Sequence, residues 1–533
     1  MRKLVLILCG ILLWAGQLAA QTRTVSGKVT DASGNPVPNA SVSVKGTRAG
    51  TTTNVSGNFN LVLPAGAQTL VISGIGMVTQ EIGITASSNY NVSLQQESRG
   101  LQEVVVTGYQ VRRKKDEAGA ISTVSGKSIE NLPNPTLDKA LQGRAAGVLV
   151  QANNGIPGGA VNVRIRGTGS FLAGNQPLYV VDGVQLNIRN DATYTQANPL
   201  SFLNPNDIES IDILKDAASA AIYGAQASNG VVIVTTKKGK AGKTRFQFNA
   251  YWGQATPIQK LEVMNSQQVF RLRSEATAFN SSASVLPSPG DLAIKRSVLN
   301  EFRIPGATGF TDKQADSAIA ALPTYDWQDE AFRTASIQNY ELSASGGNER
   351  TTFRLSGSYS FQEAVITKAD FTRGTLKFDL SNKATDKITI NTSLNLSTFN
   401  QKAPFVTDGS SIGSPAFSSA LIWPFNAIYN PDGTFANLPP SSLAGVLNQN
   451  VISVNEFSVG NNRTNQAIGN ISLDWKLTPW LTYRPFFGLD YRLVQGKQYW
   501  DPRTQDGFNR KGFGRVQSSW NTNFLTTHTL NWL

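Results

Sequence analysis

Side chains that support covalent or metal chemistry are scarce in this 533-residue sequence. It has one histidine, His528, and one cysteine, Cys9. A Ser-His-Asp triad needs a histidine beside its nucleophile, and protein zinc sites use histidine and cysteine ligands. The Gly-Thr-Gly segment at 167–169 lacks the third glycine of a dinucleotide-binding loop, because Leu172 occupies that position. We therefore expect no enzyme activity, no catalytic residue, no cofactor, no metal site and no nucleic-acid partner.

Composition and length limit the elements that position any binding site. Hydrophobic residues make up 40% of the chain and charged residues 16%, whereas an average soluble domain has about 25% charged residues. The 48 basic and 36 acidic residues give a formal net charge of +12. At about 100–200 residues per domain, the length predicts three or four domains. After the N-terminal region no segment has 18 consecutive apolar residues, so we expect no transmembrane helix.

The first twenty residues have the pattern of an export signal. Arg2 and Lys3 precede an apolar run over 4–14, and the Leu-Ala-Ala sequence at 18–20 ends this run with small residues. A membrane anchor is the alternative, but the run is shorter than the ~20 apolar residues that cross a bilayer. We expect residues 1–20 to be a cleaved signal peptide whose removal takes away the only cysteine. An exported chain without a membrane-spanning helix is secreted, periplasmic or a β-barrel in an outer membrane.

Residues 22–96 have the pattern of a small all-β domain. Short alternating segments such as 59–63 are separated by turn sequences rich in Gly, Asn and Pro, for example at 33–36. This spacing predicts a β-sandwich of about seven strands. The sequence over 27–40 resembles the carboxypeptidase-regulatory-like (transthyretin-like) module, and we expect it to be a spacer or docking module.

A linker is expected over residues 97–115. It contains a β-prone segment, 103–109, followed by the basic run 112–115. An unpaired strand between two domains is able to add to the sheet edge of a partner. The alternative is that 103–109 is the last strand of the small domain. The basic run is interpreted as solvated linker.

A series of sequence blocks carries a family resemblance. The blocks lie at 104–109, 140–148, 163–170, 177–184, 204–217, 221–224 and 229–239. In order and spacing they resemble the plug region of SusC/RagA-like TonB-dependent outer-membrane transporters, and the first resembles their TonB box. One departure is Gln102, where an acidic residue is common in this family. The resemblance implies a plug domain over 116–239.

The site residues follow from this resemblance. The TonB box, expected to bind the partner TonB, comprises Glu103, Val104, Val105, Val106, Thr107, Gly108 and Tyr109. The plug motif residues are Gly143, Arg144, Gly147, Arg164, Arg166, Gly167, Asp182, Gly183, Asp207, Asp212, Lys215, Asp216, Tyr223 and Gly224. Residues that contact the transported ligand are not assigned.

The residue pattern of the plug agrees with an α+β fold. Residues 161–166 alternate apolar and polar, as in a half-buried strand, and 231–234 are continuously apolar, as in a strand buried on both faces. Residues 217–223 are expected to be helical and to stop at Gly224. Five charged side chains are candidates for contact with a polar barrel wall, with ion pairing inside the plug as the alternative: Arg144, Arg164, Arg166, Asp182 and Asp216.

Residues 243–533 have the pattern of long antiparallel strands with one apolar face. We expect about nine strands, near 244–253, 337–346, 351–361, 371–381, 387–399, 466–476, 481–493, 513–520 and 524–533. The connections alternate between short and long, as in outer-membrane barrels. Aromatic and amide residues in the long connections are candidates for ligand stacking, with loop self-packing favoured: Trp327, Trp423, Phe425, Tyr429 and Asn448.

The expected fold is therefore mainly β, with a small β-sandwich, an α+β plug and an incomplete antiparallel transmembrane β-barrel. A barrel must close, because open sheet edges in lipid leave backbone groups unpaired. The resemblance implies 22 strands, so we expect an N-terminal portion of a longer protein.

The resemblance also implies a function. It is TonB-dependent import of a glycan- or peptide-type nutrient through the outer membrane, with the plug gating the barrel. The implied partners are TonB with its inner-membrane motor, a SusD-like surface lipoprotein, outer-membrane lipid and the nutrient itself. A TonB-linked receptor or signal transducer is one alternative, and a cell-surface β-sandwich adhesin is a less favoured one.

Overall fold

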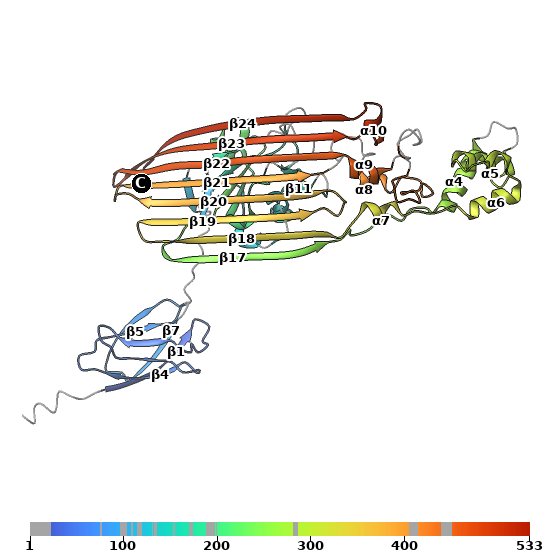
Figure 1. Cartoon of the computed structure of the whole chain (residues 1–533). Helices are drawn as coiled ribbons and strands as arrows, with labels where there is room; N and C mark the ends of the chain where they lie inside the picture. Colours follow the sequence, from blue (N-terminus) through green and yellow to red (C-terminus); the bar gives the residue numbers. More distant parts are fainter. Residues whose placement is uncertain are drawn as a thin grey trace, which may run out of the picture. The chain divides into compact units, whose positions relative to one another are not determined.

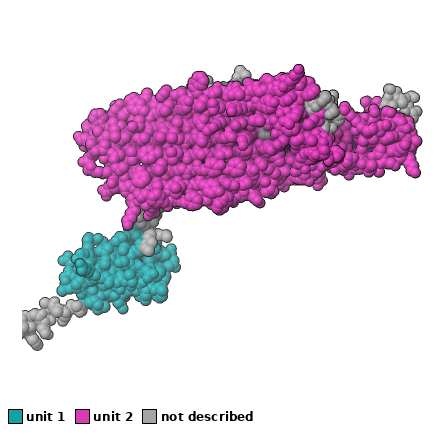
Figure 2. All heavy atoms as spheres, viewed as in Figure 1, with its two compact units in different colours: residues 1–103 teal, residues 104–533 magenta. Residues whose placement is uncertain are grey.

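A computed structural model of the chain defines its architecture (Figure 1). It describes residues 23–74, 77–95, 104–107, 110–113, 120–130, 132, 136–152, 155–169, 174–187, 198, 200–280, 286–403, 414–436, 438 and 450–532. The chain forms two compact units, residues 1–103 and 104–533, which Figure 2 shows in different colours. The expected signal peptide lies outside the described residues.

Among its described residues, the first unit has seven strands in two sheets. The strands are β1 (Arg23–Asp31), β2 (Ser41–Val44), β3 (Gly50–Thr52), β4 (Asn58–Leu63), β5 (Thr69–Ser73), β6 (Gln80–Gly83) and β7 (Asn89–Leu94). One sheet has the order β4-β1-β7 and the other β3-β2-β5-β6. Alternate side chains such as Val25 and Val29 are buried, which is the period expected of strands with one face on a core. At Gly27 a Cβ atom would meet the Tyr90 carbonyl oxygen, so close strand approach requires glycine there.

A short hairpin opens the second unit. It pairs β8 (Val104–Thr107) with β9 (Gln110–Arg113) in antiparallel register, with Val105 opposite Arg112. The strand of the expected TonB box is therefore paired along one edge with the start of the basic run, and is not unpaired as the sequence suggested. Glu103, Gly108 and Tyr109 lie outside the described residues.

The plug is an α+β globule. Its main sheet has the order β10-β15-β16-β13-β14, and β11 pairs with β12. The strands are β10 (Ile121–Ser125), β11 (Val148–Ala152), β12 (Val161–Ile165), β13 (Leu178–Val181), β14 (Val184–Gln185), β15 (Ile208–Leu214) and β16 (Val231–Thr236). The helical segments are η3 (Gly126–Ser128), α2 (Leu137–Leu141), η4 (Pro205–Asp207), α3 (Ala217–Ala220), η5 (Ala221–Tyr223) and η6 (Ala225–Ala227). As predicted, β16 is buried on both faces, and the helical run through Tyr223 ends at Gly224.

The rest of the second unit contains an antiparallel sheet of eight strands, which we call the wall. Its strands run in sequence order: β17 (Gly242–Ala255), β18 (Ala335–Gly347), β19 (Thr351–Glu363), β20 (Asp370–Lys383), β21 (Ile388–Lys402), β22 (Val459–Thr478), β23 (Leu481–Trp500) and β24 (Phe513–Trp532). Outward side chains such as Phe246 and Phe524 are exposed, whereas alternate ones such as Arg354 are buried. The connections at one end of the described strands are 348–350, 384–387 and 479–480, and those at the other end are longer.

One strand assignment from the sequence was wrong. The last two expected strands, 513–520 and 524–533, are a single strand, β24, which pairs with β23 along its whole length. Residues 521–523 lie between the two expected strands. Asn521 and Asn523 instead continue the inward face of the strand, where Asn523 donates a hydrogen bond to the carbonyl of Gln185 in the plug.

The long connections fold into a helical lobe beyond the ends of the strands, opposite the C-terminal end of the wall (Figure 1). The helices are α4 (Ser266–Phe279), α5 (Leu292–Glu301), η7 (Ala307–Gly309), α6 (Asp312–Ala320), α7 (Trp327–Ala331), α8 (Pro415–Ser418), α9 (Val451–Phe457) and α10 (Gln505–Phe508). Phe302 of the first connection stacks on Phe425 of another at 4.0 Å between ring centroids. In the described part of the chain, no helix is long and apolar enough to cross a membrane.

The candidate ligand-stacking aromatics lie in the helical lobe and pack within it. Trp327 is buried, Trp423 and Phe425 pack with Phe302, and Tyr429 donates a hydrogen bond to Glu330. These side chains hold the connections together, as the favoured alternative predicted. Asn448 lies outside the described residues.

Candidate functional site: the contact between plug and wall

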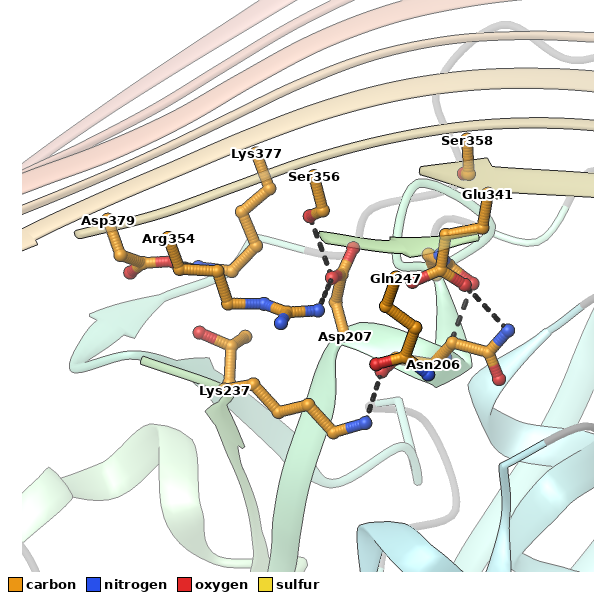
Figure 3. Close-up of polar contacts among 12 residues, drawn as sticks. Asn206, Asp207, Lys237, Gln247, Glu341, Arg354, Ser356, Ser358, Lys377 and Asp379 are labelled. Carbon is orange, nitrogen blue, oxygen red and sulfur yellow. Dashed lines mark hydrogen bonds and ion pairs between the residues drawn. The ribbon is translucent and has the colours of Figure 1, made fainter. Parts of the chain in front are cut away.

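The plug meets the wall through buried polar groups, with Asp207 at the centre. Asn204 caps η4 by accepting a hydrogen bond from the Asn206 backbone, which fixes the turn that presents Asp207. The Asp207 carboxylate accepts hydrogen bonds from Arg354 Nη2 at 3.1 Å and Ser356 Oγ at 2.7 Å (Figure 3). Asp207 and Arg354 are 3% and 8% exposed, so the ion pair is shielded from water. We call the contacts of residues 206–207 with Glu341, Arg354 and Ser356 the plug–wall seam.

Asn206 forms the second half of the seam. Its side-chain Nδ2 donates to Glu341 Oε2 on β18 at 2.8 Å, and its backbone carbonyl accepts from Lys237 Nζ at 2.7 Å (Figure 3). Lys237 also forms an ion pair with Glu130 inside the plug. The η4 turn of the plug thus contacts two neighbouring wall strands, β18 and β19, through hydrogen-bonded side chains.

Further wall side chains bind plug carbonyl groups. Arg373, fully buried on β20, donates to the Leu203 carbonyl at 2.9 Å. Gln401 on β21 donates to the Pro157 carbonyl at 3.0 Å. Because these bonds go to backbone carbonyls, they fix the position of the plug segment and do not depend on which plug side chain is present.

Asp182 lies where the turn between β13 and β14 approaches the wall. Its backbone φ is +46°, and its carboxylate accepts from the Thr236 backbone N–H at 2.9 Å and the Thr236 hydroxyl at 2.6 Å. Lys377 Nζ on the wall lies 3.8 Å from the same carboxylate, and Asn470 donates to the Asp182 carbonyl at 3.1 Å. Of the five charged candidates for wall contact, Asp182 is therefore placed against the wall.

Arg166 and Asp216 form an ion pair inside the plug, which was the alternative interpretation. Asp216 also accepts a hydrogen bond from the Ala120 backbone N–H at 2.5 Å, and this bond, followed by the charge of Arg166, lowers the pKa of the Asp216 carboxyl. Arg144 is exposed and Arg164 is half-buried.

The remaining plug motif residues mainly stabilise the fold of the plug. Asp212 is buried and accepts from the Thr123 hydroxyl, Lys215 donates to the Ala146 carbonyl, and Tyr223 is buried. The motif glycines have φ values from +73° to +100°: Gly143, Gly147, Gly167, Gly183 and Gly224. At Gly183 a Cβ atom would also lie 3.1 Å from the Phe486 ring of the wall, so glycine serves both the turn and the close approach.

Sequence reasoning missed the wall residues that contact the plug. Glu341, Arg354, Arg373 and Lys377 are charged residues on inward faces of strands, and all four are buried. A charged residue at an inward position of an alternating strand was the available signal, because such a side chain requires a buried polar partner.

A buried carboxyl in the plug, Asp138, was also missed. It is 1% exposed and accepts from Asn198 Nδ2 at 2.5 Å. Burial raises the pKa of the Asp138 carboxyl to about 7, against the lowering effect of the Asn198 hydrogen bond. It lines a plug cavity of about 500 Å³ with Tyr179. No cluster of three or more potential metal ligands occurs among the residues that the structure describes.

Comparison with known proteins identifies the parts of this architecture. Residues 113–231 match the model of the TonB-dependent Receptor Plug Domain, and residues 25–106 match that of the CarboxypepD_reg-like domain. The chain is 32% identical over 496 residues to TonB-dependent receptor SusC of Bacteroides thetaiotaomicron, covering 89% of this chain and 45% of that protein. It is 31% identical over 508 residues to TonB-dependent receptor P3 of Formosa agariphila, covering 94% and 43%.

A solved structure shares the fold. The RagAB peptide importer in the 'open-open' state superposes with a TM-score of 0.61 at 23% identity, covering 80% of this chain and 46% of that chain. The chain thus spans about half the length of the relatives it matches.

A plug held by buried polar contacts against long antiparallel strands with apolar outer faces defines the class of TonB-dependent receptors. Within this class, the chain belongs to the SusC/RagA-like family, and it carries that family's plug and CarboxypepD_reg-like domain. Its eight-stranded wall matches part of the family's barrel. The family consists of outer-membrane transporters rather than enzymes, in agreement with the sequence prediction.

Proposed function

We propose that the protein imports a glycan- or peptide-type nutrient across the outer membrane, driven by TonB. The plug–wall seam carries the proposal: it holds the plug inside the polar face of the wall, so passage requires the plug to be remodelled. Two relatives support the ligand class, since one is named SusC and another is a peptide importer, RagAB. A SusD-like lipoprotein is the proposed outer partner, by analogy with these proteins.

The proposed domain organisation follows the sequence. It has a cleaved signal peptide at 1–20, a regulatory-like domain at 22–96, a linker with the TonB box at 97–115, a plug at 116–239 and a barrel portion at 243–533. The box, Glu103–Tyr109, pairs strand to strand with TonB, and force applied there reaches the plug directly because the plug follows the box in the chain.

A proline substitution in the box separates energised import from ligand capture. Val105→Pro removes a backbone N–H that strand pairing requires, whereas Val105→Thr keeps a β-branched residue. Both changes are made in the chromosomal gene, and uptake and surface binding are measured with fluorescein-labelled oligosaccharides and oligopeptides. We expect the proline strain to bind the probe at the surface and to lose uptake, while the threonine strain keeps both.

The outcomes distinguish the alternatives. Uptake that survives Val105→Pro contradicts TonB-driven import. Surface binding that triggers a transcriptional response without uptake in the unmodified strain assigns the protein as a signal-transducing receptor instead. Binding without either uptake or response assigns an adhesin.

A further inference from the structure

A cavity of about 410 Å³ lies between the plug and the wall. On the plug side it is lined by the Asp182-Gly183 turn and by the end of β16 with the residues that follow it. On the wall side it is lined by residues of β19 to β24, including Ser393, Ser472 and Thr527. The cavity is therefore bounded by both bodies whose separation import requires.

The cavity lies at one particular end of the wall. Its lining residues Thr352, Ser381, Asp474 and Arg484 stand next to the short connections 348–350, 384–387 and 479–480. In outer-membrane barrels the short turns face the periplasm and the long loops face outward. The cavity is thus at the periplasmic end, opposite the helical lobe.

The charges around the cavity are balanced: Asp182, Asp379, Asp474, Lys238 and Arg484 line it, and Lys377 lies beside the first two. Arg484 forms an ion pair with Asp474, and Lys377 forms one with Asp379 while lying 3.8 Å from Asp182. The other wall groups named above are hydroxyls, which both donate and accept hydrogen bonds. Such a lining suits a neutral chain of hydroxyl or amide groups better than a strongly charged ligand.

The plug side of the cavity is held less firmly than the seam. β14 has two residues, pairs with β13 alone and forms the edge of the plug sheet. Its bonds to the wall run from neutral amides to backbone carbonyls, from Asn470 to Asp182 at 3.1 Å and from Asn523 to Gln185 at 2.9 Å, and Lys377 lies 3.8 Å from the Asp182 carboxylate. Asp207 instead accepts from a buried guanidinium and a hydroxyl. Hydrogen bonds that involve a charged group are about twice as strong as neutral ones, so this edge opens at lower cost than the seam.

We infer that this cavity is the periplasmic outlet of the transport path, and that displacement of the Asp182-Gly183 turn opens it for a neutral, hydroxyl- or amide-rich ligand. The inference rests on the proposed import function and adds the side of the plug along which the ligand leaves. It assigns the outlet to the wall strands β19–β24.

Cysteine labelling tests the outlet without knowledge of the ligand. Thr527→Cys places a thiol in the cavity, and Ser519→Cys is the matched control, because both residues are half-buried inward positions of β24 and Ser519 does not line the cavity. The variants are made in the chromosomal gene, and biotin-maleimide labelling is compared in energised and uncoupled cells. We expect energisation to speed labelling of Thr527→Cys by about 5-fold or more, to leave Ser519→Cys unchanged, and to lose its effect when Val105→Pro is added.

A bulky substitution provides the second readout. Thr527→Trp fills the cavity from the wall, so we expect probe uptake to fall while surface binding stays; Ser519→Trp should retain both. Energy-independent labelling of Thr527→Cys in a strain with normal energised uptake overturns the outlet and leaves the import function standing. If the unmodified strain shows no energised uptake, the import function itself is overturned. Equal effects at 519 and 527 also overturn the outlet.

Discussion

Removing Arg354 tests whether the seam fixes the plug. Arg354→Met keeps an unbranched apolar stem and deletes the guanidinium. The buried Asp207 carboxylate then has the Ser356 hydroxyl as its remaining wall donor in the seam. Breaking a buried ion pair by removing one partner costs about 3–5 kcal/mol, because the remaining charge stays desolvated. Since every 1.4 kcal/mol is tenfold, local opening of the plug beside Asp207 should rise by roughly 100- to 4,000-fold.

Hydrogen exchange of the purified protein in detergent measures this opening. The expected change is faster exchange in β15, which follows Asp207 directly, with little change in the outer strands of the wall. Arg350→Met is the matched control, because Arg350 is an exposed arginine in the turn between β18 and β19, the two wall strands of the seam. The double variant Asp207→Asn with Arg354→Met should lose less than the sum of the single variants, since neither charge is then left unpaired.

The reasoning is refuted by an Arg354→Met protein whose β15 exchange matches that of Arg350→Met. It is also refuted by strict additivity in the double variant, because additivity means that the two side chains do not interact in the folded protein.

Three further predictions concern the plug and the lobe. The folded Asp138 carboxyl has a pKa of about 7 against an ordinary 3.8, so between these pH values the folded state binds more protons than the unfolded state. The free energy of unfolding should therefore fall by up to about 4 kcal/mol as pH rises from 4 to 7. Asp138→Asn should abolish this pH dependence in denaturant titrations. Gly158 and Gly143 both have positive φ, but a Cβ at Gly158 would lie 2.2 Å from the Phe371 ring, whereas a Cβ at Gly143 would face open space. In thermal unfolding, the free energy of unfolding should fall by about 3 kcal/mol for Gly158→Ala and by about 1 kcal/mol for Gly143→Ala. Phe302→Ala removes a buried ring from the lobe core and should destabilise the lobe by about 3–5 kcal/mol, seen as faster hydrogen exchange there and unchanged exchange in the wall.

The strands and their faces were predictable from the sequence, because side chains alternate with a period of two along each strand. Phe353 and Leu355 were expected outward and Arg354 inward, and the structure has them so. The partners of inward residues were not predictable. Asp207 and Arg354 are 147 positions apart, and their meeting depends on how the plug is seated against the register of several strands.

The plug motif illustrates the same limit. The resemblance named Asp182, Asp207 and Asp216 together, but nothing in their local sequence distinguishes an aspartate that faces the wall from one that pairs inside the plug. Asp216 follows a strand end and meets Arg166, whereas Asp207 ends a capped turn aimed at the wall. The side that each turn presents is a property of the folded sheet, and so these roles required the structure.

The stacking of Phe302 on Phe425 joins two connections that are separated by four complete strands of the chain. A segment that shares its core with another cannot be exchanged alone, because a graft of either one would bring half of an interior and expose the other half to water. We therefore expect that functional chimaeras between relatives must transplant both segments as a pair, and that natural variation in the two is inherited jointly.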